Sequence, residues 1–247
     1  SEKNPALKLD TCVAMTQGSI GYWLQNALTN EFEKRNIAKP VISVVTQVRV
    51  DKEDPSFKKP SKPIGPFYTK EEADAEAAKD GSTYVEDAGR GYRKVVPSPM
   101  PKEIVEKEAV RALVEADVLT ICSGGGGIPV VAEDGQYVGV EAVNDKDFSA
   151  RVLAENVDAD RLIILTGVDN IYINYNQPDQ KALEQISVAE AEEYIKEGHF
   201  AAGSMLPKIE AALDFVKGDD KRKAIITSIE NLENIDKEAG TVISQKG

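Results

Sequence analysis

The chain contains few of the residues that build metal centres or disulfide frameworks. Its 247 residues include two cysteines, Cys12 and Cys122, and one histidine, His199. Two cysteines at this spacing match neither a disulfide framework nor a zinc pattern, and their apolar neighbours predict small buried side chains in a reducing compartment. One histidine cannot supply a metal site of known spacing, and no Ser–His–Asp arrangement accompanies it. We expect His199 to cap the C-terminus of the preceding helix.

The sequence also lacks an excess of basic residues and long hydrophobic runs. It has 30 Lys and Arg against 42 Asp and Glu, a net charge of -12. This balance argues against nucleic acid or an anionic membrane as the main partner. No apolar run approaches the length of a membrane span, and residues 1–5 lack the basic and apolar regions of a signal peptide. We therefore expect a cytoplasmic protein without a membrane partner.

The composition that remains is that of a globular protein, with 41% hydrophobic and 29% charged residues. Strands and helices are expected to alternate, which predicts a mostly parallel sheet between helical layers. Strands are predicted at residues 41–48, 118–121, 136–140, 162–166 and 223–228, and helices at 18–36, 71–79, 102–116, 146–155, from Ser187 onward and at 204–217. The polar, proline-punctuated stretch from about residue 51 to 99 interrupts the alternation and predicts a functional lid or a small excursion.

Four consecutive glycines, Gly124, Gly125, Gly126 and Gly127, follow the strand predicted at 118–121. Glycine tolerates positive φ and lets the backbone pass close to a ligand. A glycine loop after a strand can offer backbone N–H groups to phosphate oxygens. The alternative is a tight turn at the end of a strand. Because the motif G-x-x-x-x-G-K-[ST] is absent, the loop is not a P-loop.

Two lysines occupy positions near helix N-termini, where a cation is mildly unfavourable unless an anion lies nearby. Lys146 belongs to Asn144-Asp145-Lys146-Asp147, and Lys208 belongs to the segment 203–209. Asn144 or Asp145 can cap the first helix, with Asp147 in its first turn, and Ser204 can cap the second. A phosphate site would explain both lysines. Solvated surface lysines are the alternative.

A further polar cluster follows the strand predicted at 162–166, and includes Asp169, Tyr172, Asn174 and Tyr175. These side chains could hold a nucleoside, with Asp169 on a hydroxyl and a tyrosine against the base. The alternative is a loop whose tyrosines pack on the sheet. The residues themselves therefore predict an α/β protein that binds a nucleotide or another phosphate, without defining a reaction.

Several longer motifs together resemble the carbamate kinases, within the amino acid kinase family. They are DTCVAMTQG at 10–18, KPIGPF at 62–67, EDAGRGYRKVVPSP at 86–99, the glycine loop, DKD at 145–147 and GSMLPKI at 203–209. The resemblance spans essentially the whole chain. It implies a three-layer α/β/α sandwich in a single domain over 1–247, with a small protruding lid subdomain within residues 51–99, and a homodimer.

The resemblance also implies a reaction, reversible phosphoryl transfer between ATP and carbamate to give ADP and carbamoyl phosphate, with Mg²⁺. This is the ATP-forming step of arginine breakdown by the arginine deiminase pathway. Lys62 is expected to reach the transferred phosphoryl group, and Lys146 and Lys208 the ATP phosphates. Asp147 is expected to position these lysines and Mg²⁺. The nucleotide site is expected to include Gly124, Gly125, Gly126, Gly127, Asp169, Tyr175, Met205 and Lys208, and no residue is assigned as a direct metal ligand.

The start of the chain departs from the family pattern. The Gly-Gly-Asn and Gly-Asn-Gly-Pro loops that carbamate kinases have near their start do not occur here, so the resemblance implies that an N-terminal segment is missing. Two alternatives follow. The chain could be another amino acid kinase, such as an acetylglutamate or uridylate kinase, or a catalytically inactive fragment that still binds nucleotide.

Overall fold

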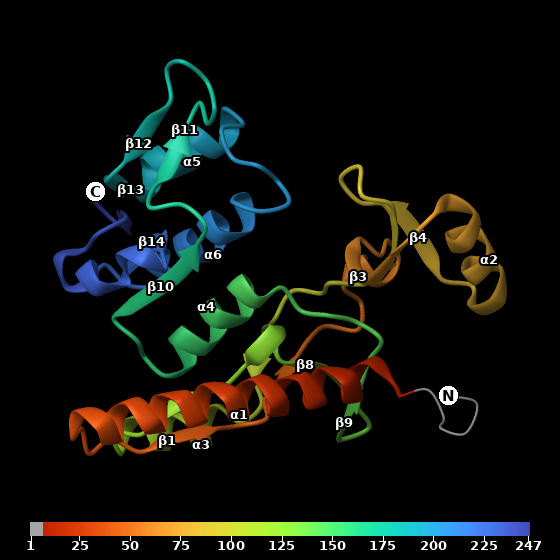
Figure 1. Cartoon of the computed structure of the whole chain (residues 1–247), viewed down its shortest axis with the longest axis horizontal. Coiled ribbons are helices and arrows are strands. Elements are labelled where there is room, and N and C mark those ends of the chain that lie inside the picture. The colour runs from red at the N-terminus through yellow and green to blue at the C-terminus, as the bar shows by residue number, and fades with distance from the viewer. Residues whose placement is uncertain (1–6) are drawn as a thin grey trace. The chain divides into compact units, whose positions relative to one another are not determined.

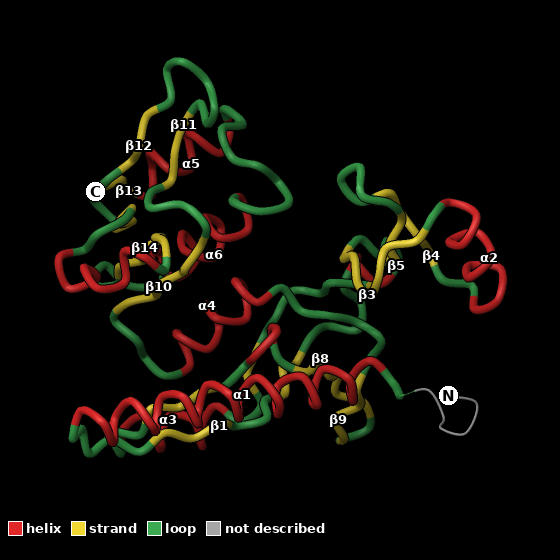
Figure 2. Tube along the Cα trace, in the orientation of Figure 1, coloured by secondary structure: helices red, strands yellow, loops and turns green. Residues whose placement is uncertain are grey.

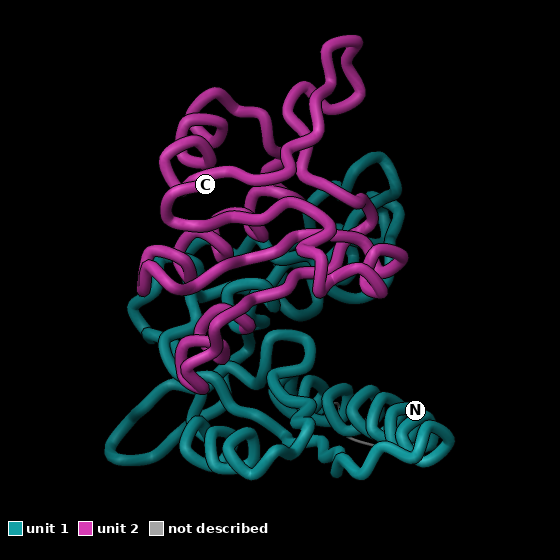
Figure 3. The backbone as a smooth tube through the Cα atoms, turned by 90° about the vertical axis from the view of Figure 1, so that its left-hand side faces the viewer, with its two compact units in different colours: residues 1–149 teal, residues 150–247 magenta. Residues whose placement is uncertain are grey.

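The computed structural model describes residues 7–247, which divide into two compact units. Among the described residues, unit 1 comprises residues 7–149 and unit 2 comprises Ala150–Gly247 (Figure 3). α4 (Lys146–Asn156) contains the division between them. Each unit has its own strands and helices (Figure 2). The single domain expected from the sequence stays a prediction.

Unit 1 combines a long helix with short sheets (Figure 1). α1 (Leu9–Arg35) packs against β1 and the glycine loop, and β1 (Val41–Ser43) pairs in parallel with β7 (Leu119–Ile121). A second sheet has the order β6–β2–β8–β9, in which only β2 and β8 are parallel. The strands of that sheet are β2 (Gln47–Arg49), β6 (Glu103–Ile104), β8 (Ile128–Glu133) and β9 (Gln136–Gly139), and α3 (Lys107–Glu115) lies between β6 and β7.

Long-range pairing changes two of the predicted elements of unit 1. The strand expected at 41–48 is two strands, because Gln17 from α1 bonds both the N–H and the carbonyl of Thr46, at 2.9 and 3.0 Å, and so interrupts the ladder. The helix expected at 102–116 begins only at Lys107, because the backbone of residues 102–105 pairs with β2 instead. α1 begins at Leu9 rather than at the predicted Gly18, and Gly18 lies within the helix.

The segment 51–99 has a sheet of its own. β3 (Lys62–Tyr68), β5 (Tyr92–Val96) and β4 (Thr83–Glu86) form an antiparallel sheet in that order. α2 (Lys70–Asp80) connects β3 to β4, and Thr69 and Glu72 form a capping box at its start. The predicted excursion therefore has regular structure, and its role as a lid stays a proposal.

Unit 2 is a four-stranded sheet in the order β10–β14–β15–β13 with helices packed on it. β10 (Arg161–Thr166) is parallel to β14 (Lys223–Ser228), β13 (Gln185–Ser187) is parallel to β15 (Thr241–Ser244), and β14 and β15 are antiparallel. α5 (Val188–Lys196) and α6 (Leu206–Lys217) contact the sheet, and β11 (Ile171–Ile173) and β12 (Lys181–Leu183) form a hairpin. The core includes Ile209, Phe215, Ile225, Ile226 and Ile243, all fully buried.

The two cysteines have different surroundings, which corrects the expectation that both are buried. Cys12 is exposed on α1, whereas burial raises the pKa of the Cys122 thiol to about 11. Only about one Cys122 in a thousand is then thiolate at pH 8, so a thiol reagent should label one cysteine quickly and the other slowly. Mass spectrometry should find the fast label on Cys12. A Cys12→Ser variant that still labels quickly would contradict this.

Candidate functional site

The glycine loop is a turn with an unusual backbone, between β7 and β8. Ser123, Gly125, Gly126 and Gly127 all have positive φ, and Gly126 is at φ +100°. Inside the loop, the Gly126 N–H donates to the Ser123 carbonyl at 3.0 Å and the Gly127 N–H to the Gly124 carbonyl at 3.1 Å. Among residues 7–247, no hydrogen bond occupies the backbone N–H groups of Gly124 and Gly125. Two adjacent N–H groups of this kind can bind an anion.

Gly126 is the position where a side chain is excluded most clearly. A Cβ there would lie 2.6 Å from the backbone oxygen of Asn144, whereas a Cβ on Gly125 would meet nothing within 4 Å. Gly126→Ala is therefore expected to lower the free energy of unfolding by about 2–4 kcal/mol, since strain and a backbone clash add. Gly125→Ala, the matched control, carries only the positive-φ cost of about 1–2 kcal/mol. Urea unfolding measures both, and equal losses would contradict the close approach.

Lys62, at the start of β3, is joined to the segment that begins α4. Its Nζ lies 2.8 Å from Asp145 Oδ2, and Asp145 also accepts the backbone N–H of Asp147 at 2.9 Å. Burial raises the pKa of Asp145, but the hydrogen bonds from Lys62 and Asp147 outweigh it and leave this pKa below its usual value of 3.8. Asp145 is thus ionised at neutral pH. It caps α4, as the sequence allows, and it joins the segment 51–99 to the start of that helix.

Lys146 and Asp147 follow directly. Asp147 is buried, and Lys146 Nζ lies 3.3 Å from Asp147 Oδ2 although 65% of the Lys146 side chain is exposed. The Lys146 ammonium group therefore pairs with Asp147, while most of the Lys146 side chain is exposed to solvent. The structure places Lys62, Lys146, Asp147 and the four glycines in unit 1.

The candidate nucleotide residues of unit 2 line a cavity of about 690 Å³. Tyr175, Met205 and Lys208 all contribute to it, together with Thr166, Gly167, Val168, Tyr172, Asn174, Gly198, His199, Phe200, Ala201 and Ser204. The Tyr172 and Tyr175 rings lie 5.9 Å apart, and Tyr175 is half exposed. The volume is in the range that encloses a small ligand, and its walls combine aromatic groups with a few polar ones.

Lys208 lies in the first turn of α6, as the sequence predicts, but Ser204 does not cap this helix. Met205 is the cap residue, and the helix begins at Leu206 with Pro207 in its first turn. The reason is a preceding turn in which the Ala201 carbonyl accepts the N–H groups of residues 204–206. Ser204 instead lines the cavity beside Lys208.

Two further predictions need correction in detail. His199 does not cap α5 with its ring: the cap residue is Glu197, and the group of His199 that bonds a carbonyl of the helix is its backbone N–H, which donates to Tyr194 at 3.2 Å. The His199 ring lines the cavity, with Nε2 3.0 Å from Glu197 Oε2. Asp169 is not among the cavity-lining residues; its carboxylate accepts the hydroxyl of Ser228 at the ends of β10 and β14.

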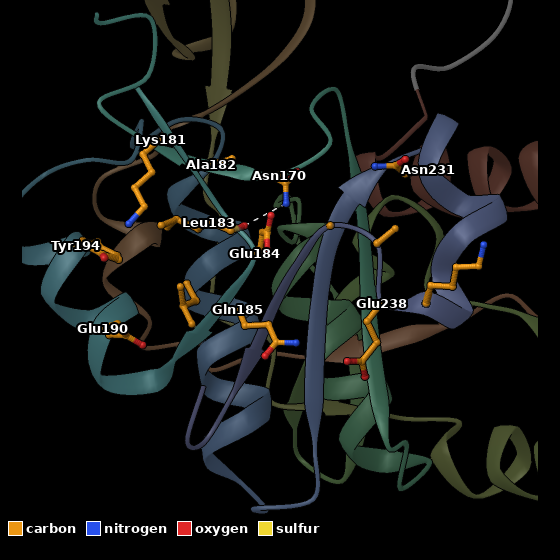
Figure 4. A pocket seen from close by; sticks show the side chains of 14 residues that line it. Asn170, Lys181, Ala182, Leu183, Glu184, Gln185, Glu190, Tyr194, Asn231 and Glu238 are labelled. Carbon is orange, nitrogen blue, oxygen red and sulfur yellow. Dashed lines mark hydrogen bonds between the residues drawn. The ribbon is translucent and has the colours of Figure 1, made fainter. Parts of the chain in front are cut away.

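Unit 2 has a second, larger cavity of about 840 Å³ (Figure 4). Its charged lining residues are Glu184, Glu190, Glu238, Lys181 and Lys237. Asn170 also lines it and donates to the Leu183 carbonyl at 3.1 Å (Figure 4). Because carboxylates outnumber ammonium groups there, this cavity is a poorer place for a polyphosphate than the one that contains Lys208.

Within residues 7–247, no cluster of three or more His, Cys, Asp or Glu side chains is arranged to hold a metal ion. In the same residues, the helices are too short or too polar to cross a membrane.

Several contacts of the site have no signal in the sequence. The Lys62–Asp145 pair, the clamp of Gln17 on Thr46, and two side chains on the Gly126 carbonyl, those of Asn144 and Ser149, all join distant parts of unit 1. The sequence shows only that Asn144 and Ser149 are polar; that both are buried is visible only in the structure.

Comparisons with known proteins identify the family. The model of the amino acid kinase family matches residues 67–228. The curated carbamate kinase 1 of Enterococcus faecium is 59% identical over 99% of this chain and 79% of its own length. The curated carbamate kinase of Lentilactobacillus hilgardii is 55% identical over 100% of this chain and 78% of its own length. A solved carbamate kinase from Giardia lamblia bound to AMP-PNP is 44% identical, with a TM-score of 0.89 over 98% of this chain and 77% of that one.

Proposed function

This chain belongs to the carbamate kinases of the amino acid kinase family, and from that membership we propose that it transfers a phosphoryl group between ATP and carbamate. The products are ADP and carbamoyl phosphate, and the reverse reaction makes ATP at the end of arginine breakdown. The family, the fold and the enzyme class expected from the motifs are confirmed. The observation that carries the proposal is the identity of 59% and 55% to carbamate kinases over nearly the full chain.

Phosphoryl transfer requires positioning and neutralisation of charge more than covalent work by the protein. In unit 1, the N–H groups of Gly124 and Gly125 bind phosphate oxygens, and Lys62 and Lys146 supply positive charge. Carbamate arrives as an anionic oxygen nucleophile, so no general base is needed. The lid segment that carries Lys62 excludes water, which would otherwise hydrolyse carbamoyl phosphate.

In unit 2, the cavity of about 690 Å³ takes the nucleoside. Tyr175 packs against the base, Met205 contributes apolar surface, and Lys208 reaches the phosphates. Asp169 directly follows Val168, a lining residue, and is the proposed partner of a ribose hydroxyl. The Giardia relative carries AMP-PNP, a nucleotide of the same class, which supports this assignment.

The residues present fit Mg²⁺ as a companion of the nucleotide. Magnesium is usually held by one or two carboxylates plus substrate phosphates, so a three-residue cluster is not required. Asp147, buried beside Lys146, is the carboxylate that would hold it. When bound, Mg²⁺ neutralises phosphate charge. We also propose a cytoplasmic homodimer, as for the family that the motifs resemble.

The test is an assay of ATP formation from ADP and carbamoyl phosphate by the purified protein, with forward reactions on carbamate, N-acetylglutamate and UMP in parallel. We expect turnover of carbamoyl phosphate and carbamate alone. Turnover of N-acetylglutamate or UMP without carbamate would instead assign another amino acid kinase. Binding of ADP with no turnover of any substrate would assign an inactive nucleotide-binding protein.

A further inference from the structure

The carbonyl of Gly126 is held by two buried side chains. Asn144 Nδ2 donates to it at 3.1 Å and Ser149 Oγ at 2.7 Å. Asn144 is 1% exposed and Ser149 is fully buried. Neither hydrogen bond belongs to a helix or a sheet. We call Asn144 and Ser149 the carbonyl bracket.

The bracket carries a cost that packing alone would not require. The amide oxygen of Asn144, Oδ1, is buried and has no hydrogen-bond partner among the described residues. A leucine of similar size would fill the space without leaving a buried acceptor unsatisfied. The favourable contribution of Asn144 is thus its donor group, which is directed at Gly126.

The position of the bracket in the chain gives it a second consequence. Asn144 and Ser149 flank Asp145-Lys146-Asp147, the segment that pairs with Lys62 and begins α4. Fixing the Gly126 carbonyl fixes the following peptide plane, whose N–H closes the loop on the Gly124 carbonyl. The bracket therefore sets both the orientation of the Gly124 and Gly125 N–H groups and their register with Lys146.

We propose that Asn144 and Ser149 are positioning residues for phosphoryl transfer, which hold the glycine-loop amides where the transferred phosphoryl group needs them. This inference rests on the proposed function. The bracket touches no substrate itself. Its loss displaces the amides, and displacements of the order of 1 Å can cost about 100-fold in rate.

The test compares Asn144→Leu and Ser149→Ala with wild type in the ATP-forming assay. We expect kcat to fall about 10- to 100-fold and KM for ADP to change by a smaller factor, because the cavity proposed for the nucleoside is in unit 2. The double variant should lose less than the product of the single losses, since both residues hold one carbonyl. If Asn144→Leu does not fold, Ser149→Ala, which removes one oxygen atom, carries the test.

Val110→Ala is the control for a merely structural effect, because Val110 is a buried residue of α3 in the same unit. It should lower Tm and leave kcat unchanged. Bracket variants that lower Tm with kcat within twofold of wild type would overturn the proposal. If wild type itself makes no ATP, the proposed function fails. Hydrogen exchange of residues 123–127 then tests the bracket alone: faster exchange in the variants supports it, and unchanged exchange overturns it.

Discussion

Lys208→Ala is expected to lower kcat for ATP formation by at least about 100-fold, the scale observed when one preorganised charge stabiliser is lost. Lys208 lies in the first turn of α6 and lines the cavity of unit 2. A cation at a helix N-terminus opposes the helix dipole, and a bound polyphosphate reverses the sign of that interaction. Initial rates at saturating ADP and carbamoyl phosphate measure the effect.

Lys217→Ala is the matched control, because Lys217 is a lysine at the other end of the same helix. Its ammonium group lies 2.7 Å from Glu192 Oε1, and both side chains are more than 40% exposed. Exposed pairs of this kind contribute about 0–1 kcal/mol to stability, so kcat should be unchanged. A Lys208→Ala enzyme as fast as Lys217→Ala would remove Lys208 from the site.

Lys62→Ala is expected to have a comparable effect on kcat, again about 100-fold or more. Lys62 pairs with Asp145, and its charge lies beside the segment that contains Lys146 and Asp147. We expect the ammonium group to exchange this carboxylate for the phosphoryl group during the reaction. Lys59→Ala, an exposed lysine in the same segment, is the control and should retain the wild-type rate.

The pH dependence of this pair follows from the sign of the shift. The pKa of Asp145 is lowered on folding, so its stabilisation is present above the ordinary value of 3.8 and is lost as pH falls through the lowered pKa. An Asp145→Asn variant should therefore be less stable than wild type at neutral pH, and the difference should shrink in acid. Asp145 titrates with a pKa below its ordinary value of 3.8. If the rate of the Lys62→Ala variant changes with pH near neutrality where the rate of wild type does not, that change does not arise from Asp145.

Elements with strong local patterns could be predicted from the sequence. The strand predicted at 223–228 is β14, a run of six residues without polar interruption in its middle. Ser187 and Glu190 form the expected capping box at the start of α5. In both cases the signal lies within a few residues of the chain, so no tertiary contact was needed to interpret it.

The features that escaped prediction depend on contacts between distant residues. Gln17 interrupts a strand at Thr46, 29 residues away, and Ser149 reaches Gly126 across 23 residues. Ser204 looks like a helix cap, but the turn at Ala201 moves the start of α6 to Leu206. The roles of the candidate site residues stay predictions, whereas the partner of Lys62 and the side chains behind the glycine loop emerge only from the structure.

The central claim, that this chain binds a nucleotide polyphosphate through ammonium groups and backbone amides, is tested most directly by a crystal structure with ADP and Mg²⁺. We predict the adenosine in the cavity lined by Tyr175 and Met205, with a phosphate oxygen within hydrogen-bond distance of Lys208 Nζ. ADP bound in the acidic cavity of Figure 4, with the Lys208 cavity empty, would contradict the account.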